Sequence, residues 1–392
     1  MAYEKNLKTN IPKYFLYLLT SRRNFWPILS IFFLTLPNTT AQQIGIWSAI
    51  GFLTSFIFEI PSGYFADEIG HKLTLVLSKI FLIVSMVAFI FATSLTYFII
   101  GAIFLNLGIS FYSGTGSAFM HNTLTEVNKG RSYTKIMSKI KANVSLISII
   151  LIIILPFLTK ISILLPLQMT LGIDVFGLFI ALSFYSPKTR VKAKKKGEKI
   201  IPKLLRSSLG TGFYPMILFL GILGGLIFAA GNYRYVYLEA MGLPIIFMGF
   251  VMGISRFFWF MSGHQAHKIE KKIDMKQLIT IELFLFPLLY FLVALFSNPY
   301  IIGLIFALIM GYYWGRNEII TNYFLNNFVV DSNYKATMLS IKNQMSSVFQ
   351  AIFVFLIGFF MVISYKTGYY ILSIGSLTLL AIVYIRLRKY LK

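Results

Sequence analysis

The chain has 392 residues, of which 57% are hydrophobic and only 12% are charged, and its mean hydropathy is +0.76. Ordinary soluble domains carry about twice that charged fraction, so the composition excludes a soluble protein and predicts an integral membrane protein. The net charge of +23 does not indicate nucleic-acid binding, because the basic residues lie between apolar segments. The absence of cysteine excludes disulfides, thiol catalysis and cysteine-based metal sites.

Apolar runs of about 20 residues predict twelve transmembrane helices. The first run follows three lysines and lacks a small-residue cleavage site, so we expect a retained span rather than a cleaved signal peptide. The expected spans are 12–36, 43–65, 73–93, 96–119, 142–159, 163–185, 213–236, 244–262, 276–297, 300–322, 342–363 and 368–386.

Lysine and arginine are concentrated in alternate connections between these spans. Only Lys160 and Lys366 fall in connections on the opposite side of the predicted membrane. Because short loops rich in positive charge stay in the cytosol, we expect a multi-pass protein of the cytoplasmic membrane with both termini inside the cell.

The longest polar interruption lies near the middle of the chain. Residues 187–208 carry nine lysines and arginines and separate a half at 1–186 from a half at 209–392. This basic cytosolic segment is either a solvated linker or an amphipathic helix on the anionic inner leaflet.

The two halves show a weak internal repeat. A shift of 200 residues aligns Ser62 and Gly63 with Ser262 and Gly263, and both pairs follow an even-numbered span. Parallel repeats of six helices predict a cleft near the bilayer midplane that opens alternately to each side of the membrane.

The segment between the second and third spans reads Gly63-Tyr-Phe-Ala-Asp-Glu-Ile-Gly-His-Lys72. It resembles the loop signature of the major facilitator superfamily, Gly-x-Leu-Ala-Asp-Arg-x-Gly-Arg-Lys, with Glu68 and His71 at two positions that are usually basic. Segments 113–124 and 335–340 resemble a bacterial drug-efflux-like branch of that superfamily. In segment 113–124, the acids that are usual in that branch are replaced, so the resemblance does not imply proton coupling through this segment. The resemblance implies two parallel six-helix halves that transport a solute by alternating access.

The resemblance also implies that the signature forms a cytosolic gate between the halves. Gly63 would let its helix approach a neighbour closely, and Asp67 would accept hydrogen bonds from the start of an adjacent helix. The alternative is a charged turn that is merely solvated. The gate residues are Gly63, Asp67, Glu68, Gly70, His71 and Lys72.

Charged side chains inside the predicted spans are candidate substrate or coupling sites, because a charge at the bilayer centre costs at least about 2.5 kcal/mol. We expect Glu59 to pair with one of the two arginines of the first span, and Arg256 to pair with Glu282. Asp174 has no basic residue within two turns of its own helix, so it is either reversibly protonated or a neutral, hydrogen-bonded acid. The candidates are Arg22, Arg23, Glu59, Asp174, Arg256, Glu282, Arg316 and Glu318.

The sequence therefore predicts an all-α, twelve-helix secondary transporter and no enzyme. The leading interpretation is proton-coupled efflux of a small amphipathic or lipophilic molecule. Uptake or exchange of an anionic metabolite or lipid-like substrate is the alternative that the cleft arginines favour, and a receptor or scaffold without transport is another. We expect a monomer whose partners are a small-molecule substrate, protons and membrane lipids. No phosphate loop or metal-ligand cluster appears, so no cofactor, metal or nucleic-acid partner is expected.

Overall fold

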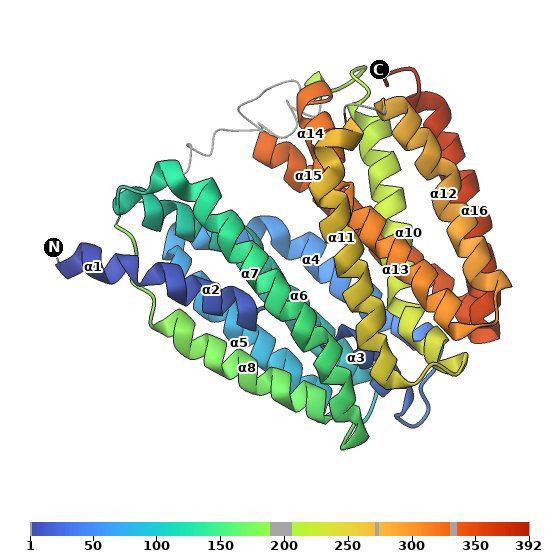
Figure 1. The fold of residues 1–392 in the computed structure, drawn as a ribbon, viewed down its shortest axis with the longest axis horizontal. Coiled ribbons are helices and arrows are strands. Elements are labelled where there is room, and N and C mark those ends of the chain that lie inside the picture. Colours follow the sequence, from blue (N-terminus) through green and yellow to red (C-terminus); the bar gives the residue numbers. More distant parts are fainter. Residues whose placement is uncertain (1, 189–205, 271–273, 330–334, 392) are drawn as a thin grey trace. The chain divides into compact units, whose positions relative to one another are not determined.

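The computed structural model describes residues 2–188, 206–270, 274–329 and 335–391 (Figure 1). Within these ranges the chain forms α-helices joined by short 3-10 turns, and no strand occurs there. Helices are the expected outcome for such apolar segments, because lipid offers no hydrogen bonds to the backbone. Nine of the described helices are long and apolar enough to cross a membrane.

Each predicted span overlaps a helix or a pair of consecutive helices, although α7 and α15 begin at Tyr133 and Lys335, before the predicted starts at 142 and 342. The first span is divided into α2 and α3, and the tenth is divided into α13 and α14. The helices are α1 (Ala2–Lys8), α2 (Asn10–Thr20), α3 (Trp26–Leu34), α4 (Ala41–Ile69), α5 (His71–Ile90), α6 (Leu95–Glu126), α7 (Tyr133–Ile154), α8 (Leu165–Leu182), α10 (Phe213–Ala240), α11 (Met248–Glu270), α12 (Met275–Leu295), α13 (Pro299–Gly315), α14 (Asn317–Asn327), α15 (Lys335–Ile363) and α16 (Tyr365–Leu387), with 3-10 turns η1 (Gly130–Ser132), η2 (Leu155–Lys160) and η3 (Ile245–Phe247).

The chain divides into two compact units. The first contains Met1–Phe32 and Leu53–Lys196, and the second contains Phe33–Phe52 and Gly197–Lys392. In the first unit α5 packs on α6 and α8, and α2 packs on α7 and α8. In the second unit α10 packs on α15 and α16, while α11 packs on α13. Most of the predicted basic linker, residues 189–205, lies outside the described part of the chain.

The first residues of α4 are part of the second unit. Ser48 donates a hydrogen bond to Asn232 of α10, with the two oxygens 3.1 Å apart. A Cβ at Gly45 would lie 2.5 Å from the carbonyl oxygen of Val354 and 2.6 Å from the hydroxyl of Tyr233. Glycine at this position therefore allows α4 to pack directly against α10 and α15.

The connection that carries the gate signature is much shorter than the sequence predicts. α4 continues to Ile69, beyond the predicted end of the second span at residue 65, and α5 begins at His71. Only Gly70 separates the two helices, and its φ of +100° is readily available to glycine. The Thr74 hydroxyl donates to the Gly70 carbonyl at 3.0 Å and completes this tight corner. The charged residues before Gly70 are compatible with helix, so the helix ends only where the backbone must reverse.

Gly108 is a point of close approach between α5 and α6. Ser78 of α5 donates to the Gly108 carbonyl at 2.7 Å, and a Cβ at Gly108 would lie 2.7 Å from the Leu82 side chain and 3.0 Å from the Ser78 carbonyl oxygen. These contacts leave no room for a branched side chain.

We expect Gly108→Val to lower the thermal unfolding temperature of the purified protein in detergent, because overpacking costs about 1–3 kcal/mol. Gly114→Val on the same helix is the matched control, since a Cβ there meets no atom within 4 Å. Equal losses in the two variants would contradict the close α5–α6 approach.

Candidate functional site

The first unit contains a break in its first span that is held by an arginine side chain. α2 ends at Thr20 and α3 begins at Trp26. Arg23 donates from Nη2 to the Thr20 carbonyl at 3.0 Å and from Nε to the Ser21 carbonyl at 3.2 Å. Carbonyls at a helix C-terminus have no N–H partner within the helix. The N–H groups of Arg23 bind two of the carbonyls that the break leaves without backbone partners.

The same guanidinium binds Asp174 of α8 through two contacts. Nη1 lies 2.6 Å from Oδ2 and Nη2 lies 2.7 Å from Oδ1. Lys79 of α5 lies 3.2 Å from Oδ1, and its ammonium also faces the Tyr17 ring at 5.1 Å from the centroid. Lys79 and Asp174 are fully buried, and Arg23 is 7% exposed. We call Arg23, Lys79 and Asp174 the buried triad; it joins two cations to one carboxylate.

Asp174, which has no basic residue within two turns of its own helix, is therefore paired with two basic side chains from elsewhere in the chain, so the expectation of a neutral, hydrogen-bonded acid does not describe this structure. Its partners lie 151 and 95 residues away in the chain, in the break after α2 and on α5, so the sequence of α8 by itself does not reveal them. Lys79 is not among the candidate site residues predicted from the sequence. A single lysine within the apolar run 73–93 does indicate a buried charge that needs a partner. The expected pairing of Glu59 with Arg22 or Arg23 is also wrong, because Arg23 binds Asp174 and Glu59 accepts a hydrogen bond from Ser113 of α6 at 3.4 Å.

The second unit has a corresponding break in the tenth span. α13 ends at Gly315 and α14 begins at Asn317. Arg316 lies between them, with its Nε 2.8 Å from Oε1 of Glu282 on α12 and its guanidinium 4.8 Å from the Tyr313 ring centroid. The expected pairing of Glu282 with Arg256 is wrong, because the break turns Arg316 toward α12, whereas Arg256 interacts electrostatically with Tyr235 of α10.

Glu282 is less completely bonded than Asp174. Tyr312 donates to its Oε1 at 3.3 Å, but Oε2 is buried without a hydrogen-bond partner among the described residues. Arg316 Nε is close to Oε1 but poorly aligned with it, so the contact is an ion pair rather than a hydrogen bond. Buried polar atoms are normally hydrogen-bonded, which singles out Glu282 as a carboxyl group with unused bonding capacity.

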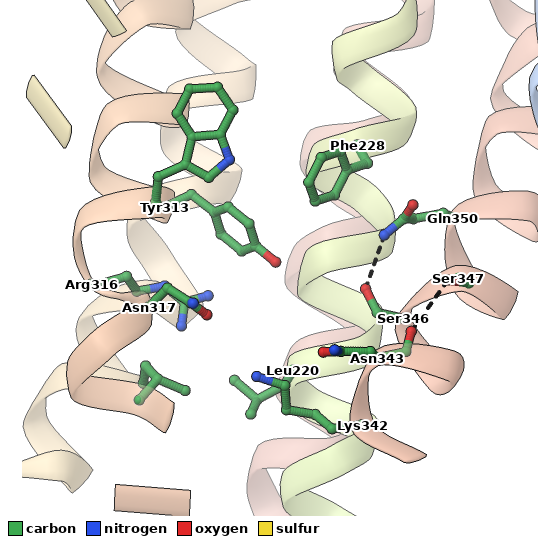
Figure 2. Close-up of a pocket in the computed structure, with 12 residues that line it drawn as sticks. Leu220, Phe228, Tyr313, Arg316, Asn317, Lys342, Asn343, Ser346, Ser347 and Gln350 are labelled. Carbon is green, nitrogen blue, oxygen red and sulfur yellow. Dashed lines mark hydrogen bonds between the residues drawn. The ribbon is translucent and has the colours of Figure 1, made fainter. Parts of the chain in front are cut away.

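A cavity of about 310 Å³ lies beside Arg316 in the second unit. Figure 2 shows Arg316 and Asn317 on one side of it and Asn343, Ser346 and Gln350 of α15 on the other. The described residues that line it include two cations, Arg316 and Lys342, and no acid. The cavity therefore offers positive charge, amides and hydroxyls to a ligand.

Aromatic side chains and a glycine complete this cavity. Phe228 of α10 and Tyr313 of α13 line it between the polar groups. A Cβ at Gly224 of α10 would lie 2.8 Å from both the Ser346 and the Tyr313 hydroxyl oxygens. Gly224 thus lets these two hydroxyls approach α10, while Gln350 donates to Ser346 at 3.0 Å and orients it.

The remaining predicted residues lie elsewhere. Arg22 is half-buried beside a smaller cavity in the first unit. Asp67 and Glu68 are exposed at the end of α4, and a Cβ at Gly63 would meet no atom of the described residues within 4 Å. His71 and Lys72 are half-buried at the start of α5. The side chains of Glu318 and of residues 262–272, which carry the second signature copy, lie outside the part of the chain that the structure describes.

Comparison with known proteins identifies relatives over nearly the whole chain. The family model of the Major Facilitator Superfamily matches residues 15–353. An uncharacterized MFS-type transporter of Bacillus subtilis, YxaM, is 25% identical over 319 residues, which cover 78% of this chain and 77% of that protein. Among solved structures, the nucleoside transporter NupG superposes with a TM-score of 0.76 at 12% identity, with 100% of both chains covered. An inward-facing bacterial homologue of the human lysosomal transporter Spinster gives a TM-score of 0.71 at 13% identity, covering 99% of this chain and 97% of the other.

The buried triad predicts opposite effects for two neutralising substitutions. Asp174→Asn leaves two buried cations without a carboxylate, and removing one partner of a buried ion pair costs about 3–5 kcal/mol. Lys79→Met leaves the Arg23–Asp174 pair intact and should be neutral or stabilising. We expect thermal unfolding in detergent to show a large loss for Asp174→Asn only. An Asp174→Asn variant as stable as the parent would contradict this assignment.

Proposed function

Since the chain belongs to the Major Facilitator Superfamily and is a multi-pass membrane transporter rather than an enzyme, we propose that it carries a small polar solute with an anionic group. The observation that carries this proposal is the lining of the larger cavity, where Arg316 and Lys342 are accompanied by amides and hydroxyls and by no described acid. Its volume of about 310 Å³ is at the lower end of the range for small-molecule sites.

The polar lining favours an anionic metabolite over a lipophilic compound. An apolar ligand would remove Asn317, Asn343 and the two cations from water without replacing their hydrogen bonds, which is unfavourable. Phe228 and Tyr313 can contact a planar or apolar part of the same solute. NupG, which shares the fold, is by name a transporter of nucleosides and so of polar solutes. Efflux of a lipophilic molecule stays a prediction from the sequence.

Arg316 links the cavity to Glu282 and supports proton coupling there. In this structure the Arg316 charge is balanced by Glu282 at 2.8 Å. An anionic solute that binds Arg316 competes with Glu282 for the guanidinium. Glu282 is fully buried and its Oε2 has no hydrogen-bond partner among the described residues. Without Arg316 its negative charge would be unpaired, and binding a proton removes that charge. Solute and proton then cross together as the protein alternates between its open states.

Lys342 provides the first test of the substrate class. Counterflow in proteoliposomes measures the apparent affinity for a transported carboxylate or phosphate solute. Lys342→Gln should lower this affinity about tenfold, because a charge-assisted contact is lost. Lys276→Gln is the matched control, since Lys276 is exposed at the start of α12. Absence of flux for every anionic solute in a broad panel would favour a receptor or scaffold, and neutral solutes preferred over anionic ones would contradict the proposal.

Glu282→Gln tests the coupling step separately from binding. The amide cannot exchange a proton, so a pH gradient should no longer drive accumulation of the solute, while counterflow in the absence of a gradient should persist. Lys79→Met, which removes a buried ionisable group from the other unit, should keep gradient-driven transport. Unchanged driven accumulation by Glu282→Gln would remove Glu282 from the coupling mechanism.

A further inference from the structure

Arg22 is a membrane-embedded cation whose side chain pairs with no acid among the described residues. It lies two residues beyond the end of α2 at Thr20, and that end is about 12 Å along the helix from the start of the predicted span at residue 12. Its neighbour Arg23 is held by Asp174 and by two carbonyls, whereas Arg22 is half-buried and interacts electrostatically with the Tyr112 hydroxyl. A cation at this depth requires an anion, a polar cavity or water.

Arg22 lines a separate cavity of about 160 Å³ in the first unit. Residues of α2, α7, η2 and α8 form its walls, which are mostly aliphatic and include Leu19, Leu151, Leu155 and Ile173. The cavity is smaller than sites for drug-sized ligands. It can therefore hold a head group and the first carbons of a chain, with the rest of the molecule outside.

The other polar side chains of this cavity each make a hydrogen bond within the protein. Thr20 donates to the Tyr17 carbonyl, Thr170 donates to the Pro166 carbonyl, and the Asn24 side-chain oxygen accepts a hydrogen bond from Ser148 at 2.7 Å. Arg22 is consequently the charged lining residue that has no acidic partner among the described residues. No acid contributes to the described lining, so the cavity has positive charge and apolar walls.

The mouth of the cavity is apolar. Leu16 of α2 and Phe176 of α8 both line it, and these side chains are 37% and 54% exposed. An alkyl chain that leaves the cavity across them gains by burying apolar surface. A ligand with one anionic group at Arg22 and one alkyl chain at the mouth would therefore match both the charge and the apolar walls of this cavity.

We propose that Arg22 and this cavity bind an amphiphile with a single anionic head group, a carboxylate or a phosphate, and an alkyl chain. This site is distinct from the Arg316 cavity, which is lined by residues of the second unit. The head group compensates the charge of Arg22, and the chain follows Leu19 and Ile173 toward Leu16 and Phe176. The source of the amphiphile is either the bilayer or the aqueous phase, and the chemistry of recognition is the same for both.

The test uses the full chain purified in an uncharged detergent, titrated calorimetrically with octyl phosphate, octanoate, octanol and inorganic phosphate. Octyl phosphate and octanoate should bind, while octanol and inorganic phosphate should bind at least about tenfold more weakly, because each lacks one of the two recognised features. Octanol binding as tightly as octyl phosphate would overturn the role of Arg22.

Three variants locate the site. Arg22→Gln should weaken octyl phosphate binding about tenfold or more, and Ile173→Trp should do the same by filling the cavity without a change of charge. Arg131→Gln is the matched charge control, because Arg131 is exposed in η1, and it should bind as the parent does. Equal affinity of Arg22→Gln and the parent, or of Ile173→Trp and the parent, would place the ligand elsewhere.

Two further measurements separate this site from the proposed transport site and identify the source. Lys342→Gln should bind octyl phosphate normally, so loss of binding in that variant would assign the amphiphile to the Arg316 cavity and overturn the proposal. Native mass spectrometry from phosphatidylglycerol nanodiscs should show retained lipid that Arg22→Gln loses if the bilayer supplies the amphiphile. Octyl phosphate binding without such retention assigns the site to soluble amphiphiles, and absence of both contradicts it.

Discussion

The contact between Arg23 and Asp174 is the interaction on which the arrangement of the first unit depends. One guanidinium satisfies two carbonyls at the broken end of α2 and both oxygens of a carboxylate on α8. Taking these groups out of water is costly, and the cost is offset only when the geometry is close and every lone pair is used. Lys79 extends the contact to α5, so the break in the first span is connected through Asp174 to two other helices, α8 and α5.

The second unit also has an arginine at a helix break that pairs with a buried acid, but that acid makes fewer hydrogen bonds. Arg316 also lies at a helix break and also pairs with a buried acid, but one oxygen of Glu282 has no hydrogen-bond partner in the described part of the chain. Saturated bonding around Asp174 favours a fixed, structural ion pair. Around Glu282, Arg316 is the one cation within ion-pair distance among the described residues, and one carboxylate oxygen has no hydrogen-bond partner there. This difference in bonding is the reason why we propose a structural role for Asp174 and a coupling role for Glu282.

Both helix breaks lie beside cavities. Irregular backbone at membrane depth is tolerated where it is buried in protein or lines a cavity, and discontinuous helices often mark binding sites in transporters. Arg22 follows the end of α2 and lines the smaller cavity, while Arg316 and Asn317 line the larger one. The two cavities differ in chemistry, since one has aliphatic walls and the other has amides and hydroxyls. A single chain thus presents two kinds of surface to anionic groups.

The positions of the spans followed from the sequence because membrane insertion depends on the apolar character of each segment by itself. The superfamily likewise followed from a local motif, Gly63–Lys72, together with the expected twelve spans. The pairing of charges did not follow, because Asp174 and Arg23 are 151 residues apart and the pattern on one helix does not specify its neighbours. The close corner at Gly70 and the cavity beside Arg316 were also decided only by tertiary structure. They depend on where the chain reverses and on which side chains from several helices meet, and these are properties of packing rather than of any one segment.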